Sequence, residues 1–383
     1  MEIKQLGTIA TSAINQIMGK DYITELNDSN IVDIGKDIVN SERVDAVCRT
    51  LASMVGKIEI QSDVYKKRLK SLFVDSYEWG GFIERIYTDL ETVSDSLMWS
   101  LTDGTDYSSH EHTYHKPKVS AKIFEEAKGI MVTLSRSTEQ FKEAFRSMDD
   151  LNKYATMLQQ NIRNTINVAL DSLSHSLVSS AIAVSDKALN NSVHLVTEAI
   201  ANGLLNSGAT AEDFLKSDNC LVYMCERIAN VKGYIQGINR TFNNGNLATF
   251  CEKADVILLS DIKNAIKYRV RPHNYQDLVD IDGEEVIAWQ GTTTAETKYD
   301  FDTLSQIKIS ADATEKLGIG STAVTINNAI ALVKDRRSMG ICLYKEKVTS
   351  SYTACADFWN EFTNILVNYM LDTNYSVVAF ILD

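Results

Sequence analysis

The most regular apolar pattern in the chain lies between Asp149 and Leu189. Apolar side chains recur at spacings of three and four, at Leu151, Tyr154, Leu158, Ile162, Ile166, Ala169, Leu173, Leu177 and Ala181. This spacing predicts one α-helix of roughly 40 residues, about 50 to 60 Å long. The opposite face carries polar residues, at Gln160, Arg163, Asn164, Asn167, Ser174 and Ser185. We therefore expect the helix to lie along a sheet, and not in a membrane or a coiled coil.

The chain before this helix has weaker patterns. Residues 1–70 alternate short helical patterns with polar stretches, so we expect an arm with little core of its own. From Val74 to Lys118 the sequence is polar and dotted with aromatic residues, without a sustained apolar face. This composition predicts an extended excursion away from the body.

Residues 119–137 predict a strand, a turn and a second strand, with Ile130, Val132 and Leu134 alternating toward one side. Ser137 and Gln140 then fit a capping box, which predicts that a helix carrying Phe141 to Met148 begins there.

The second half of the chain mixes helical and strand patterns. We expect helices over 193–205 and 221–238, and a turn over 243–245. A buried strand over 256–259 precedes a brief helix that Ser260 and Asp261 are expected to cap.

The last third of the chain is expected to be rich in strands. Residues 277–303 predict a hairpin that turns at Asp282 and Gly283. The β-prone run over 375–383 reaches the last residue, and we expect this strand to be locked into a sheet, since unheld termini fray.

Composition narrows the class of protein. The chain has 383 residues, 44% of them hydrophobic and 23% charged, which favours a folded protein of two or three domains. Its net charge of −13 argues against a dedicated DNA-binding protein. Apolar runs are too short to cross a bilayer, and the N-terminus lacks the pattern of a secretory signal, so we expect a protein kept in a cytosol. Only two prolines, Pro117 and Pro272, suit long helices and strands.

Six cysteines are scattered without a CxxC pair, at Cys48, Cys220, Cys225, Cys251, Cys342 and Cys355. We expect reduced thiols, most of them buried as small apolar groups. Cys220 and Cys225 are too far apart for a zinc knuckle, so core packing is favoured for both.

Three other sets of residues were considered as ligand-binding sites. His110, His112 and His115 with Glu111 suggest a metal site, but an exposed loop tip is favoured because no cysteine lies nearby. Gly318 and Gly320 lack the lysine of a phosphate-binding loop, which favours a turn.

A cluster of acidic residues could form a calcium-binding site, since carboxylate oxygens bind this ion. The cluster consists of Asp277, Asp280, Asp282, Glu284 and Glu285. A hairpin tip is favoured, because Gly291 occupies the position of the last glutamate of an EF-hand loop. No GxSxG motif is found. We therefore expect no catalytic, cofactor-binding or metal-binding residue.

Four segments in order resemble a known family. They are FIERIYTDLETV from Phe82, the run MVTLSRS to DSL from Met131, DVILLSDIKNAI from Asp255, and AIALVKDRRSMGICLYKEKV with its continuation from Ala329. Together they resemble the major head protein of short-tailed phages of the phi29 type. The resemblance implies an α+β fold of the Hong Kong 97 capsid type. It implies an N-terminal arm over 1–73, an extended loop over 74–124, a peripheral domain with a spine helix over 125–189, an axial domain over 190–335, and a return to the peripheral domain over 336–383.

The resemblance also implies a function. Copies would self-assemble as pentamers and hexamers of an icosahedral shell that encloses the double-stranded DNA of a short-tailed phage. Portal, scaffold and head-fibre proteins are candidate partners, the inner face would touch DNA without specificity, and no membrane is involved. The protein would be part of the virion, assembled in the host bacterial cytoplasm, and not an enzyme.

The extended loop would have no partner within its own chain, so its aromatic residues are expected to bury themselves on a neighbouring subunit. These residues are Tyr77, Trp79, Tyr87, Trp99 and Tyr107. Two alternatives remain open: an encapsulin-like shell that houses enzymes, and a cytosolic αβ enzyme with an unrecognised site.

Overall fold

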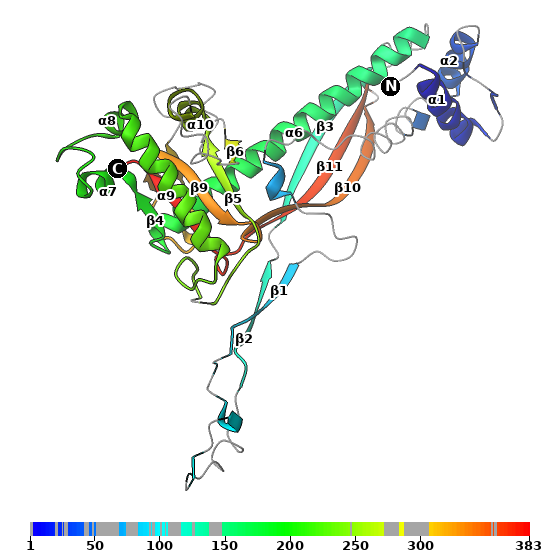
Figure 1. Cartoon of the computed structure of the whole chain (residues 1–383). Helices are drawn as coiled ribbons and strands as arrows, with labels where there is room; N and C mark the ends of the chain where they lie inside the picture. The colour runs from blue at the N-terminus through cyan, green and yellow to red at the C-terminus, as the bar shows by residue number, and fades with distance from the viewer. Residues whose placement is uncertain are drawn as a thin grey trace.

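The structure is a computed structural model of the chain (Figure 1). It describes residues 3–19, 22–24, 26, 30–41, 46–47, 50, 69–73, 83–91, 93, 96–99, 102–103, 105, 116–124, 127–137, 148–245, 247–271, 283–286, 306–353, 355 and 358–383. Two larger sheets, one very long helix and a projecting two-stranded ribbon organise these residues (Figure 1).

The predicted long helix is confirmed as α6 (Met148–Lys187), with 40 residues. Its buried stripe includes Ile166, Leu170 and Leu177, and it packs on strands of both larger sheets. The stretch from residue 162 to 187 is long and apolar enough to cross a membrane by composition, but most of it is buried as a core helix.

The polar face predicted for α6 is not exposed at its C-terminal end. Ser174 and Ser185 are buried, and so is every residue from Ala181 to Asp186. The reason is tertiary, because this end of the helix enters the body of the molecule. There the Ser185 hydroxyl accepts a hydrogen bond from the Ala379 amide, 3.1 Å away.

An antiparallel three-stranded sheet lies along α6, in the order β10 (Met339–Thr353), β11 (Phe358–Leu371), β3 (Ala127–Ser137). The predicted alternation in β3 is confirmed, since Ile130, Val132 and Leu134 are less exposed than the residues between them. On β11 the residues that face the helix, such as Ile365 and Val367, are buried.

The second sheet has five strands, in the order β4 (Ser192–His194), β12 (Val377–Ile381), β9 (Ala329–Asp335), β5 (Ala254–Leu259), β6 (Gly283–Val286). β12 pairs with β4 in parallel and with β9 antiparallel, so the expected locking of the last strand is confirmed. Strand β12 therefore completes the sheet of β5 and β9, whereas β10 and β11 belong to the three-stranded sheet.

Short helices surround this sheet. They are α7 (Leu195–Ala201), α8 (Ala211–Lys216), α9 (Asp218–Gln236), α10 (Ser260–Ala265), the π-helix η3 (Ile266–Val270) and α11 (Ala311–Lys316), with the small ribbon β7 (Ile307–Ile309) and β8 (Val324–Ile326).

The helix predicted over 193–205 is confirmed for residues 195–201 as α7, but the chain first forms strand β4, because β12 offers it a parallel partner. Two other local predictions in this region are wrong. Helix α10 begins after Leu259 without a side-chain cap, so Ser260 and Asp261 are its first residues and not its cap. Gly283 opens β6, which pairs in parallel with β5, and is therefore not part of a hairpin turn.

The N-terminal part, expected to be an arm with little core of its own, buries a few apolar side chains. Helix α1 (Ile3–Met18) and helix α2 (Ile31–Asn40) bury Ile14, Ile31 and Ile38 completely. The Asn15 side chain adds two hydrogen bonds, to the amide and the carbonyl of Ile23. The segment therefore has a small helical core near the N-terminal end of α6 (Figure 1).

The expected excursion is confirmed for its described residues. Strands β1 (Ile83–Thr88) and β2 (Val119–Phe124) form an antiparallel ribbon that leaves the body and points away from it (Figure 1). One 3-10 turn, η1 (Lys70–Leu72), precedes the ribbon in sequence, and a second, η2 (Leu97–Trp99), lies between its two strands. The capping box at Ser137 and Gln140 and the helix after it fall largely outside the described residues.

Candidate assembly interface

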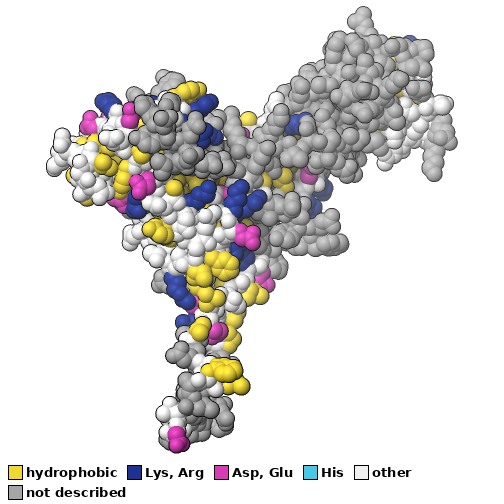
Figure 2. All heavy atoms as spheres, viewed as in Figure 1, with side chains coloured by type: hydrophobic (Ala, Val, Ile, Leu, Met, Phe, Trp, Pro, Cys, Tyr) yellow, Lys and Arg dark blue, Asp and Glu magenta, His cyan; other side chains and the backbone are white. Residues whose placement is uncertain are grey.

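The β1–β2 ribbon has two different faces. In the antiparallel register Ile86 lies opposite Ala121, Thr88 opposite Val119, and Glu84 opposite Ile123, so these side chains share one face. Ile86, Val119 and Ile123 are 67%, 57% and 53% exposed. Hydrophobic side chains are visible along the ribbon and at its base in Figure 2. We call Ile86, Val119, Ala121 and Ile123 the apolar ribbon face.

The opposite face holds the ribbon to the body. The Tyr87 hydroxyl donates a 2.5 Å hydrogen bond to Oδ2 of Asp372, and Nη1 of Arg85 lies 3.1 Å from the same oxygen. Asp372 is fully buried, in the connection between β11 and β12. Burial and the hydrogen bond to this carboxylate raise the pKa of Tyr87, so the phenol stays protonated and acts as a donor.

The backbone fixes Asp372 in turn. Its amide donates a 2.6 Å hydrogen bond to the carbonyl of Ser338, in the turn between β9 and β10. Its Oδ1 accepts a hydrogen bond from the amide of Asn374. The carboxylate is therefore a rigid acceptor, placed where the two larger sheets and the ribbon meet.

Two arginines lie against one aromatic ring at this junction. The guanidinium carbons of Arg85 and Arg337 are 5.4 Å and 4.4 Å from the centroid of the Tyr375 ring. Both distances are within the range of cation–π attraction. Tyr87 also contacts Tyr375, with ring centroids 5.9 Å apart.

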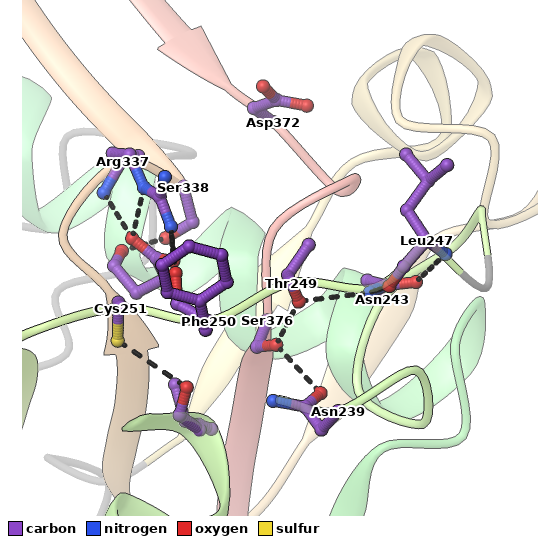
Figure 3. Close-up of polar contacts among 12 residues, drawn as sticks. Asn239, Asn243, Leu247, Thr249, Phe250, Cys251, Arg337, Ser338, Asp372 and Ser376 are labelled. Carbon is purple, nitrogen blue, oxygen red and sulfur yellow. Dashed lines mark hydrogen bonds and ion pairs between the residues drawn. The ribbon is translucent and has the colours of Figure 1, made fainter. Parts of the chain in front are cut away.

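Arg337 connects this junction to Asp335 and to the backbone of Phe250 (Figure 3). Its guanidinium pairs with both oxygens of buried Asp335, and Nη2 donates to the carbonyl of Phe250 at 2.5 Å. The hydrogen bond with Asp335 raises the pKa of Arg337. In the turn between β9 and β10, the Ser338 hydroxyl donates a 2.7 Å hydrogen bond to the carbonyl of Asp335.

A neutral network continues on the β12 side (Figure 3). The Ser376 hydroxyl donates to the Asn239 side chain and lies 3.3 Å from the Thr249 hydroxyl. The Asn243 amide donates to Thr249 and to the carbonyl of Leu247. Because most of these groups are buried, their mutual hydrogen bonds avoid the penalty of an unsatisfied polar group.

A second anchor holds the ribbon at the end of β1. Oδ2 of Asp89 forms an ion pair with Nη1 of Arg240, 3.0 Å away, and Oδ1 accepts a hydrogen bond from the amide of Ala248. The hydrogen bonds from Arg240 and from this amide lower the pKa of Asp89 below its ordinary value. The loop that follows α9 thus ties the base of the ribbon to the five-stranded sheet.

The predicted interface residues divide into two groups. Trp99 is 85% exposed, as an intersubunit contact requires. The expectation for Tyr87 is wrong, because its ring is buried within its own chain against Asp372 and Tyr375. Tyr77, Trp79 and Tyr107 lie outside the described residues.

The other candidate sites give a mixed result. The histidine cluster His110, His112 and His115 with Glu111 lies outside the described residues, as do Asp277, Asp280 and Asp282. Glu284 and Glu285 lie in β6. Within the described part of the chain, no group of three or more His, Cys, Asp or Glu side chains is placed to hold a metal ion.

The smaller predictions are confirmed. Cys220 and Cys225 are buried and unpaired, and burial raises the pKa of Cys225 to about 12. Cys251 and Cys342 are also buried and form no disulfide with a described residue, whereas Cys355 is exposed and Cys48 lies outside the described residues. Gly318 and Gly320 have φ values of 69° and 144°, as a turn that favours glycine requires.

Asp372, Arg337 and Tyr375 were not predicted from the sequence. No motif marks them, and they meet Arg85 and Tyr87 across more than 250 residues.

Solved structures share this architecture. One chain of "Capsid structure of Staphylococcus phage Andhra" aligns with a TM-score of 0.53 and 9% identity, covering 84% of this chain and 86% of that one. A chain of "Structure of head fiber and inner core protein gp22 of native bacteriophage P68" aligns with a TM-score of 0.52 and 11% identity, covering 83% and 85%. No curated protein matches the sequence.

A spine helix along an antiparallel sheet, a second buried sheet and a projecting ribbon define a capsid subunit of the Hong Kong 97 type. The sequence identifies the family more closely. Residues 7–381 match the family described as Phi29-like phage major capsid protein, and the chain belongs to this family. It is a major capsid protein that builds the shell of a phage virion.

Proposed function

We propose that copies of this capsid protein join into pentamers and hexamers through the apolar ribbon face, each ribbon packing on a neighbouring subunit. One observation carries the proposal: Ile86, Val119 and Ile123 are exposed on one face of the ribbon, while Tyr87 and Arg85 fix its other face to the body. A ribbon held in this way presents its apolar side in a defined direction. A heterologous contact of this kind closes into rings.

Burial of the apolar ribbon face favours the contact. Full burial of one isoleucine or valine side chain contributes about 1.5 to 3 kcal/mol, so three partly exposed side chains supply at most several kcal/mol per contact, which offsets part of the entropy lost on association. Each subunit would give one ribbon and receive one, so the gain is repeated around every ring. The exposed side chains of Trp99 and Met98, further along the excursion, would add to the buried area.

The remaining assignments belong to the same proposal. The protein works as a structural subunit without catalysis, assembled in the host bacterial cytoplasm, with double-stranded DNA inside the shell and portal or scaffold proteins as partners. We assign the N-terminal segment to 1–73, the extended loop to 74–124, the peripheral domain to 125–189 with 336–371, and the axial domain to 190–335 with the final strand β12. The topology of β12 supports this amended boundary.

The test is one substitution with a matched control. Ile86 is 67% exposed, so Ile86→Glu places a charge on the apolar ribbon face at little cost in packing within the subunit, whereas Ile86→Leu keeps the face apolar. Electron microscopy and sedimentation should show shells for Ile86→Leu and only subunits with normal circular dichroism for Ile86→Glu. Normal shells from Ile86→Glu would refute the role of the ribbon face.

The contents of purified particles separate the remaining shell alternative. DNA inside particles made during infection supports the phage head, whereas protein cargo without DNA would support an encapsulin-like compartment. Turnover of a substrate by an unassembled subunit would support the enzyme alternative.

A further inference from the structure

Three large apolar side chains are exposed on the body of the subunit, away from the ribbon strands. Tyr234 lies in the last turn of α9, Ile238 follows this helix, and Phe250 precedes β5. Their exposed fractions are 59%, 70% and 55%. From one side of the molecule, Figure 2 shows hydrophobic side chains both on the ribbon and on the adjoining part of the body. We call Tyr234, Ile238 and Phe250 the apolar body patch.

The backbone brings two of these side chains together. Asn239 and Thr249 form an antiparallel bridge, in which each amide donates to the other carbonyl, at 3.0 and 2.9 Å. The next positions, Ile238 and Phe250, therefore lie opposite each other on one face. The side chains of Asn239 and Thr249 are on the other face, where both contact Ser376 (Figure 3). The bridge thus turns its polar side chains inward and its apolar side chains outward.

Further hydrogen bonds hold the patch in place. The Asn239 side chain donates to the carbonyls of Tyr234 and Gly237, 3.0 and 3.2 Å away. The Gln236 side chain donates to the carbonyl of Glu252 at 3.5 Å. The end of α9 and the chain before β5 therefore keep a fixed spacing. A surface that is ordered before it binds loses less entropy on association.

The same backbone is joined to the ribbon at two points. Arg85 of β1 donates a 2.5 Å hydrogen bond to the carbonyl of Arg337, and Arg337 in turn donates to the carbonyl of Phe250. Asp89 pairs with Arg240, which alternates onto the exposed side of the bridge. The ribbon and the apolar body patch therefore keep a fixed position relative to each other.

The arginines beside the patch are paired with carboxylates. Arg240 forms an ion pair with Asp89, and Arg337 forms one with Asp335. An apolar partner that covers the patch therefore does not leave either charge buried without its counterion. The two aromatic rings of the patch also belong to the residue types that are enriched at protein interfaces.

The apolar ribbon face alone is small for a contact between subunits. It consists of four side chains, whereas a specific interface covers about 800 Å² and about 20 to 30 residues on each partner. The contact therefore has to include further surface, and the apolar body patch is exposed apolar surface fixed to the ribbon. We infer that the patch packs on the same neighbouring copy of this chain as the ribbon does, so that the two form one continuous interface.

This inference rests on the proposed function, because it takes the ribbon contact as its starting point. Each copy would give both surfaces to one neighbour and receive both from the other, as a heterologous contact in a ring requires. Two separate points of contact also fix the angle between neighbouring subunits. This angle determines how many copies close a ring.

A photo-crosslinking amino acid tests the patch. One variant carries p-benzoylphenylalanine in place of Phe250, and a second carries it in place of Ile86. Shells that mix isotope-labelled and unlabelled copies are irradiated, and mass spectrometry then distinguishes crosslinks between copies from crosslinks within one copy. We expect crosslinks between copies from both positions in shells, and from neither position in unassembled subunits.

A variant with the crosslinker at both positions shows whether one neighbour is involved. A few copies of it are assembled with an excess of wild type, so that each is surrounded by copies without the crosslinker. Gel electrophoresis after irradiation should then show crosslinked dimers and no trimers. Trimers would show that the ribbon and the patch contact two different neighbours, and would overturn the inference.

Charge variants of the patch give a second readout. Ile238→Glu with Phe250→Glu should lower the yield of shells by about tenfold or more, because unpaired charges would be buried in the contact. Ile238→Leu with Phe250→Tyr should assemble as wild type. Both positions are largely exposed, so the circular dichroism and thermal unfolding of the unassembled subunits should match wild type in both variants.

The outcomes separate this inference from the proposed function. Crosslinks between copies from Ile86 but not from Phe250, with normal shells from the glutamate variant, would overturn the inference and leave the ribbon contact standing. The absence of crosslinks from Ile86 would overturn both. Crosslinks from Phe250 only to a different virion protein would assign the patch to that protein and would also overturn the inference.

Discussion

Tyr87 donates its hydroxyl hydrogen to Asp372 at 2.5 Å, across 285 residues of sequence. Through this bond the ribbon that projects from the subunit is joined to the connection between its two larger sheets. Direction and reach of the ribbon thus depend on a contact between residues that belong to different parts of the chain.

Replacing Tyr87 with phenylalanine should destabilise the subunit by about 1 to 3 kcal/mol, because a fully buried carboxylate loses one of its donors. Urea unfolding of the unassembled subunit measures the change. Tyr268→Phe removes an exposed hydroxyl and should have no comparable effect. Equal stability of Tyr87→Phe and wild type would show that Arg85 alone satisfies Oδ2 of Asp372.

Alanine at Trp79 and Trp99 should abolish particles while leaving the circular dichroism of the subunit nearly unchanged. Trp99 is 85% exposed, so its truncation removes no packing within the subunit. Trp99→Ala alone, which concerns only a described residue, should already lower the yield of shells in electron micrographs. Assembly of the double variant at the normal yield would refute a role of these indoles.

Acid should loosen the base of the ribbon through Asp89. The pKa of Asp89 is lowered in the folded state, so the charged carboxylate stabilises the fold above the pKa of the unfolded chain. This stabilisation is lost as the pH falls through the lowered pKa, when Asp89 takes up a proton and its pairing with Arg240 weakens.

Asp89→Asn tests this linkage. The variant should be less stable than wild type at neutral pH, and its stability should fall less between about pH 5 and pH 2. Chemical unfolding at a series of pH values measures both slopes. Parallel slopes for the two proteins would contradict a structural role for the charge of Asp89.

Ser185→Ala should destabilise the subunit by about 1 to 3 kcal/mol, since the Ala379 amide would lose a buried acceptor. The hydroxyl also lies 3.3 Å from the carbonyl of Val377, so one side chain joins α6 to β12. Ser180→Ala is a suitable control, because the Ser180 hydroxyl donates to the carbonyl of Ser176, one turn back in its own helix, and joins α6 to no other described element. Thermal unfolding of the two variants should therefore differ clearly.

Local patterns in the sequence determined the parts of this protein that depend on near neighbours. The spacing of three and four predicted α6, and the alternation of Ile130, Val132 and Leu134 predicted the inner face of β3. The four segments resembling the phi29-type head protein indicated the family from the sequence alone, and the match over residues 7–381 confirmed it.

Only the tertiary structure decided which elements meet. Val193 became part of a strand because β12 lies beside it, and Gly283 opened a strand because β5 offers a parallel partner. Tyr87 is buried because Asp372 and Tyr375 come to it from near the other end of the chain. Periodicity records how a residue relates to its close neighbours in sequence, whereas partners hundreds of residues away leave no local trace in the sequence.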